Sequence, residues 1–104
     1  MTTWYSLEVG NEEAAAKTMK RVMDAFMPKY IGAGRPLSMA IFSSTNQKDN
    51  AVTLYFSPKA VSLAMQFGAS ACDDIFVNKD LALLVGDQKC IELLFPEAIA
   101  QEYS

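Results

Sequence analysis

The spacing of apolar residues switches between strand-like and helix-like along the chain, and this order is what most limits the fold. Residues 3 to 9 alternate as in a half-buried strand, and residues 12 to 30 carry an apolar stripe with helical spacing. Two further strands and a second helix follow. We therefore predict an α+β fold, a ferredoxin-like βαββαβ sandwich whose antiparallel sheet carries two helices on one face. An extra strand or helix is expected at the C-terminus, and the 104 residues predict one domain over 1–104.

The first strand and helix have clear signals. Asn11 is a good N-cap, with Glu12 and Glu13 in the first turn, where the helix dipole favours acids. The predicted buried stripe comprises Met19, Val22, Met23, Phe26, Met27 and Tyr30. The opposite, solvent-facing side carries Lys17, Lys20, Arg21 and Asp24. Pro28 lacks an N–H and is expected to kink or end the helix.

A hairpin and a second helix follow. Strands are predicted at 37–43 and 51–56, joined by the polar loop 44–50. Ser57 is then the expected N-cap, and Pro58 the first residue, of a helix that ends at about Phe67 with Gly68 as the C′ residue.

The second helix is more apolar than one sheet can cover. Its polar residues are only Lys59, Ser62 and Gln66. The excess predicts contact with a second copy of the chain, and the candidate interface residues are Val61, Met65 and Phe67. The alternative is that the segment Cys90 to Tyr103 folds back and covers this surface within one chain.

The C-terminal third has weaker signals. Residues 72–80 suit a loop with a short helical turn, and the apolar run 81–85 suits a buried strand. Residues 90–95 fit either a strand or the start of a helix, and Pro96 is a possible start for a terminal helix that runs to Tyr103.

The stretch YIGAGRPLS, residues 30 to 38, resembles an anion-binding loop in composition only. Phosphate-binding glycines follow a strand and precede a helix, whereas Gly32 and Gly34 follow a helix. We interpret the segment as a turn. Arg35 is kept as a weak ligand-binding candidate because its guanidinium can hold a carboxylate with two hydrogen bonds.

The residue types exclude much chemistry. The chain has no histidine, so Ser-His and Cys-His nucleophile pairs and histidine-ligated metals are excluded. Cys72 and Cys90 are expected to be buried thiols, with a disulfide as the alternative. Asp73 and Asp74 are expected in a surface loop and not as a magnesium site. No metal and no cofactor is predicted.

Aromatic residues on the strands are the remaining ligand-binding candidates. Trp4, Tyr5 and Tyr55 can stack on a flat ligand, although core packing is the more common role of such residues. Of the 9 basic and 12 acidic residues, two basic and seven acidic ones lie in 72–104, which gives either a solvated acidic rim or an acidic edge for a basic partner. The net charge of −3 argues against nucleic acid. No membrane segment is apparent, so a cytoplasmic protein is expected.

Two function classes remain open. The first is a small binding or regulatory module that acts as a homodimer and holds a protein partner or a small apolar ligand. The second is a small cofactor-independent enzyme of the dimeric α+β-barrel type, with a pocket between sheet and helices. We favour the first, because without histidine the enzyme would depend on Arg35, a tyrosine or a carboxylate. A closed core with an apolar surface patch favours the module, and a pocket with convergent polar groups favours the enzyme.

Overall fold

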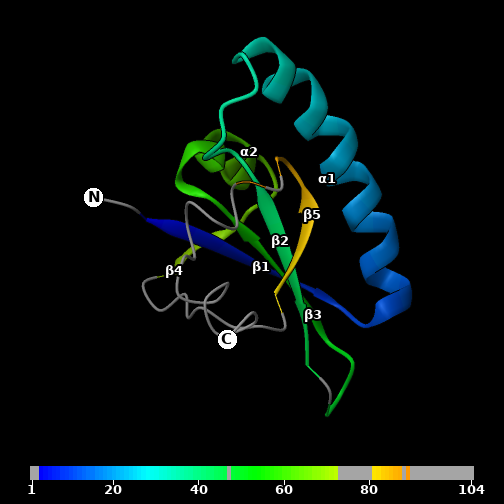
Figure 1. Ribbon diagram of the computed structural model, residues 1–104. Helices are drawn as coiled ribbons and strands as arrows, with labels where there is room; N and C mark the ends of the chain where they lie inside the picture. Colours follow the sequence, from blue (N-terminus) through cyan, green and yellow to red (C-terminus); the bar gives the residue numbers. More distant parts are fainter. Residues whose placement is uncertain (1–2, 47, 73–80, 88, 90–104) are drawn as a thin grey trace, which may run out of the picture.

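The computed structural model describes residues 3–46, 48–72, 81–87 and 89, and these form an α+β fold (Figure 1). The predicted class, an antiparallel sheet with two helices, is confirmed. The elements in chain order are β1 (Trp4–Gly10), α1 (Glu12–Gly32), β2 (Ile41–Thr45), β3 (Val52–Phe56), a 3₁₀ turn (Pro58–Ala60), α2 (Val61–Gln66), β4 (Ser70–Cys72) and β5 (Ala82–Val85).

The sheet has five strands in the order β4-β1-β3-β2-β5, and all of its pairs are antiparallel. The predicted strand 81–85 is present as β5, but it lies at the edge beside β2. The opposite edge of the sheet is formed by β4, which pairs with β1 and was not predicted. The predicted strand 37–43 was also wrong at its start, because β2 begins only at Ile41. Before it, the N–H of Met39 donates to the carbonyl of Pro36 in a turn.

Helix α1 follows the predicted pattern over most of its length. The N–H of Ala14 donates to Asn11 Oδ1 at 3.0 Å, which confirms the N-cap. Val22, Phe26 and Tyr30 are buried, but Met27, which was also predicted in the buried stripe, is 44 % exposed. Pro28 was expected to kink or end the helix, and it does not end it, since α1 continues to Gly32. Pro28 is exposed, and Ala33 N–H still bonds to the Lys29 carbonyl at 2.9 Å, so the turn beyond the proline is held by its own hydrogen bonds.

Both helices end in the same hydrogen-bonded motif. After α1, Gly34 N–H donates to the Ile31 carbonyl at 3.1 Å and Arg35 N–H to the Tyr30 carbonyl at 2.9 Å. This is the Schellman pattern, in which the C′ residue takes a left-handed conformation that glycine adopts without steric cost. Gly34 has φ +83° and, in the same position after α2, Gly68 has φ +76°. The glycines of residues 30 to 38 therefore end a helix, in agreement with the turn interpretation.

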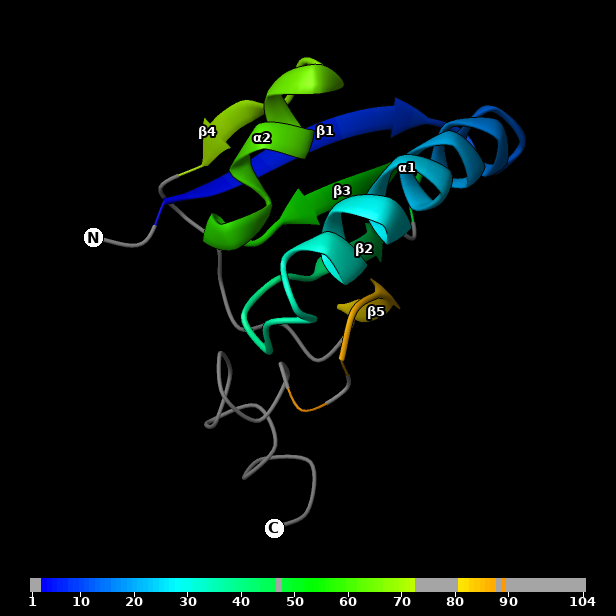
Figure 2. The ribbon, with the colours of Figure 1, turned by 90° about the horizontal axis from the view of Figure 1, so that it is seen from above.

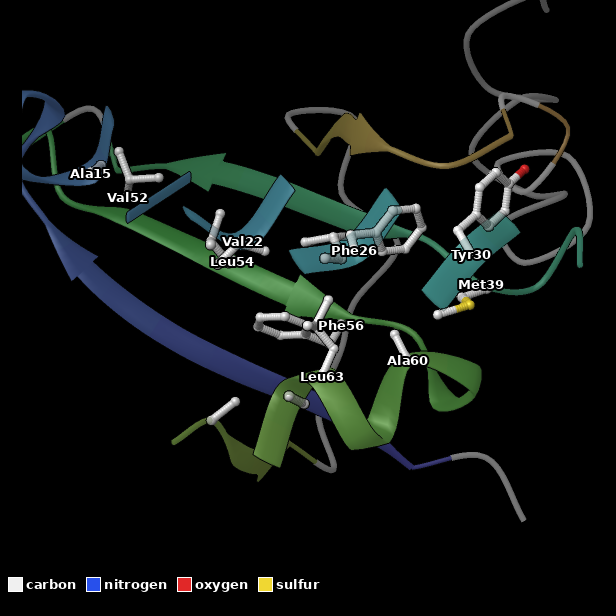
Figure 3. Packing of buried hydrophobic residues seen from close by; sticks show 13 residues of the cluster. Ala15, Val22, Phe26, Tyr30, Met39, Val52, Leu54, Phe56, Ala60 and Leu63 are labelled. Atoms are coloured by element: carbon white, nitrogen blue, oxygen red, sulfur yellow. The ribbon is translucent and has the colours of Figure 1, made fainter. Parts of the chain in front are cut away.

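The main core lies between the two helices and one face of the sheet (Figure 3). Phe26 of α1, Leu54 and Phe56 of β3 and Leu63 of α2 are all 0 % exposed. Phe26 also stacks on Tyr30 with ring centroids 5.0 Å apart. Since α1 and α2 pack against the same cluster, both lie on one side of the sheet, as Figure 2 shows. The described residues place neither helix on the other face.

Candidate binding face of the sheet

A second hydrophobic cluster lies on the face of the sheet that carries neither α1 nor α2. Trp4, Ala40 and Phe42 are buried in it, and Tyr55, Leu81 and Leu83 pack against them. We call this surface the aromatic face. An antiparallel sheet with one solvated face normally shows polar residues there. The large apolar side chains of the aromatic face therefore indicate contact with something other than water.

The strand register brings these residues together from four strands. Tyr55 of β3 pairs with Ser6 of β1 on one side and with Phe42 of β2 on the other. Phe42 in turn pairs with Leu83 of β5. Directly paired residues of antiparallel strands share a face, so Ser6, Tyr55, Phe42 and Leu83 form one row across the sheet. Trp4 lies in the adjacent row of the same face, where it pairs with Cys72 of β4, and its ring centroid lies 5.8 Å from that of Phe42.

The aromatic face has one polar end. The next row on the same side joins Glu8 of β1, Thr53 of β3 and Ser44 of β2. The pKa of the Tyr55 hydroxyl is raised, first by burial and then by the nearby Cys72 and Glu8, both of which disfavour a second negative charge. Tyr55 therefore keeps its proton at neutral pH and acts as a hydrogen-bond donor or acceptor, not as a base.

The four predicted ligand-binding residues do not share one site. Trp4 and Tyr55 lie together on the aromatic face. Tyr5 lies on the opposite face and packs against the main core. Arg35 is exposed in the turn after α1, with φ 54°. Sequence reasoning missed Phe42 and Leu83 as members of the site.

The three predicted interface residues in and beside α2 also do not share one surface. Val61 and Met65, one turn apart, are 38 % and 56 % exposed. Phe67 is half-buried against the main core, and the guanidinium carbon of Arg21 lies 5.9 Å from its ring centroid. A further contact joins the helices, because Lys29 Nζ donates to Gln66 Oε1 at 3.2 Å. The side of α2 that faces α1 is therefore occupied, while Val61 and Met65 project away from the protein.

The other candidate sites offer less. A shallow hollow at the start of α1 is lined by Asn11, Glu13, Ala14, Lys17 and Thr18, and contains none of the predicted site residues. Cys72 carries a free thiol that is half-buried, not buried as expected, and it pairs with Trp4 across β4 and β1. Nowhere in the described ranges do three cysteine, aspartate or glutamate side chains gather as metal ligands. Asp73, Asp74 and Cys90 lie outside the described residues.

Comparison of the chain with protein-family models, with curated proteins and with solved structures finds no match. Of the helices that the structure describes, none is long and apolar enough to cross a membrane. The proposed function therefore rests on the physical features of the two faces of the sheet and of α2.

Proposed function

We propose that the chain is a binding or regulatory module that acts as a homodimer through the outer side of α2. The observation that carries this proposal is the exposure of Val61 and Met65 on adjacent turns of one short helix. Single exposed apolar residues are common on monomers. Two large ones on consecutive turns, on a helix of only six residues, form a contact surface that a second copy can bury.

The packing between sheet and helices supports a module over an enzyme. A cofactor-independent enzyme of the dimeric α+β-barrel type needs a pocket in this layer. The layer is filled by Phe26, Phe56 and Leu63, each 0 % exposed. The raised pKa of Tyr55 keeps its hydroxyl protonated, so Tyr55 does not supply the aromatic face with a base at neutral pH. A surface that binds an apolar ligand or a protein partner is the function that these features favour.

We also propose a finer fold assignment than the general α+β class. The elements from β1 to β4 follow the order βαββαβ, which supports a ferredoxin-like arrangement to which β5 adds a strand beside β2. The βαββαβ order accounts for four strands only, so β5 is an addition to the ferredoxin-like sheet. Folds of this kind host unrelated functions, so the frame itself adds nothing to the choice between module and enzyme.

Sedimentation of the intact chain at micromolar concentration tests the dimer. We expect twice the chain mass of 11.4 kDa. The variant Met65→Lys should sediment as a monomer, because the interface would have to bury a charge. Leu37→Lys is the matched control, since Leu37 is 44 % exposed in the turn before β2 and undergoes the same change from an apolar side chain to lysine on another surface. A monomeric wild-type chain, or a Met65→Lys dimer, would contradict the proposal.

A further inference from the structure

The dimer proposed above needs more surface than α2 alone provides. Val61 and Met65 are 38 % and 56 % exposed, and α2 is only six residues long. A specific interface buries about 1,000 Å² in total. Two partly exposed side chains from each copy cannot supply that area. A second copy must therefore also contact the surface next to Val61 and Met65.

Val61 and Met65, which we call the α2 flank, lie on the side of α2 that is remote from α1. Leu63 faces the sheet, since it is 0 % exposed in the main core. Gln66 faces α1, because it accepts the hydrogen bond from Lys29. At about 100° per residue, Val61 and Met65 take the remaining side of the helix. α2 packs against β1 and β3, whereas α1 reaches β5 at the far edge (Figure 2). The α2 flank is therefore on the side of the molecule where the sheet ends in β4.

The outer edge of β4 has the properties of a surface that accepts a further strand. Among the strands that the structure describes, only β1 pairs with β4. Ser70 and Ala71 are both exposed, although consecutive strand residues point to opposite faces of the sheet. β4 carries no proline and no charged side chain, the features with which many edge strands avoid pairing with another chain. Ala71 lies on the same side of the sheet as α2, because its pairing partner Tyr5 packs against the main core.

We propose that two copies join edge to edge, with β4 of one antiparallel to β4 of the other and the two α2 flanks in contact above this pair. The inference rests on the proposed dimer and assigns its geometry. A two-fold axis makes the contact self-complementary, and full overlap of two antiparallel three-residue strands places Ala71 opposite Ala71 of the second copy. An unrelated extended peptide would pair with β4 but leave the α2 flank in water. A second copy covers both surfaces at once, and it joins the two five-stranded sheets into one.

Disulfide cross-linking tests the pairing of β4 directly. Ala71→Cys, in a full-length chain that also carries Cys72→Ser and Cys90→Ser, should form a covalent dimer when it is oxidised with copper phenanthroline. Paired residues of antiparallel strands have Cα atoms about 4.5–5.5 Å apart, a separation that a disulfide spans. Ala82→Cys in the same background is the matched control, because Ala82 is exposed on the opposite edge strand, β5. It should remain a single chain on a non-reducing gel. Far-UV circular dichroism checks that each variant retains the fold.

Sedimentation gives a second test that separates this geometry from the dimer itself. Ala71→Lys should sediment as a monomer, because it would place two like charges opposite each other in the strand pair. Ala82→Lys should remain a dimer. If Met65→Lys dissociates the wild-type dimer but Ala71→Lys remains a dimer and Ala71→Cys forms no disulfide, the pairing of β4 is wrong and the proposed function stands. A monomeric wild-type chain overturns both. Equal cross-linking of Ala71→Cys and Ala82→Cys also overturns the pairing, because it would reflect random collision.

Discussion

Ser57 and Ala40 hold the end of β3 to the start of β2 by two hydrogen bonds. The N–H of Ala40 donates to Ser57 Oγ at 2.8 Å, and the N–H of Ser57 donates to the Ala40 carbonyl at 3.0 Å. Both residues are 0 % exposed. Ser57 was predicted to cap the following helix with its hydroxyl. It occupies the N-cap position but makes no side-chain capping bond, because its hydroxyl is already bonded to Ala40.

This pair gives the first prediction. Ser57→Ala should lower the free energy of unfolding by about 1 to 3 kcal/mol, because the buried N–H of Ala40 loses its acceptor. Urea denaturation measures the loss. Ser62→Ala on the exposed side of α2 is the control and should change stability by less than about 0.5 kcal/mol. Equal stabilities of the two variants would show that water replaces the hydroxyl at no cost.

Phe26 gives the second prediction. It is 0 % exposed at the centre of the main core, so Phe26→Ala should lower the free energy of unfolding by about 3 to 5 kcal/mol through lost burial and the cavity that remains. Met27, the next residue, is 44 % exposed and provides the control. Met27→Ala should cost far less in the same denaturation experiment. A loss below about 1 kcal/mol for Phe26→Ala would contradict the observed facing of α1.

The turn after α1 gives the third prediction. Arg35 has φ 54°, a conformation that costs a non-glycine residue on the order of 1 kcal/mol. Arg35→Gly should therefore leave stability unchanged or raise it by up to about 1 kcal/mol. Arg35→Ala should leave phosphate affinity unchanged, because the Gly34 and Arg35 N–H groups already bond to α1 carbonyls. Phosphate binding by isothermal titration calorimetry that is lost in Arg35→Ala would restore the anion-loop hypothesis.

The Tyr55 hydroxyl gives the fourth prediction, on alkaline stability. Its pKa in the folded protein is raised above the ordinary value of 10.0 by burial, Cys72 and Glu8. Above about pH 10 the unfolded chain releases this proton while the folded chain retains it, so stability falls as the pH rises. Below that value both states hold the proton and the contribution does not vary with pH. Thermal unfolding from neutral to alkaline pH should show a smaller decline in Tyr55→Phe than in the wild type. Equal declines would show that Tyr55 titrates normally.

Local signals were sufficient to predict much of this fold. The cap at Asn11, the apolar stripe from Val22 to Tyr30 and the glycine after α2 depend on interactions within a few residues, so the sequence pattern alone indicates them. The strand predicted over 51–56 likewise corresponds to β3. Pro28 did not end the helix as its missing N–H had suggested, because the hydrogen bonds beyond it, such as that from Ala33 N–H to the Lys29 carbonyl, carry α1 to Gly32.

The tertiary structure alone decided which segments form the edges of the sheet and the composition of the aromatic face. Residues 70–72 are too few to show a periodic pattern, and they form β4 because β1 offers a free edge to pair with. Strand 81–85 was visible in the sequence, but its place beside β2 was not. Trp4 and Phe42 are far apart in the chain, and their contact depends on the pairing of β1, β3 and β2. The sequence determines the elements through short-range hydrogen bonds and periodicity, whereas neighbours across the sheet are selected by long-range pairing, for which a single sequence carries no local signal.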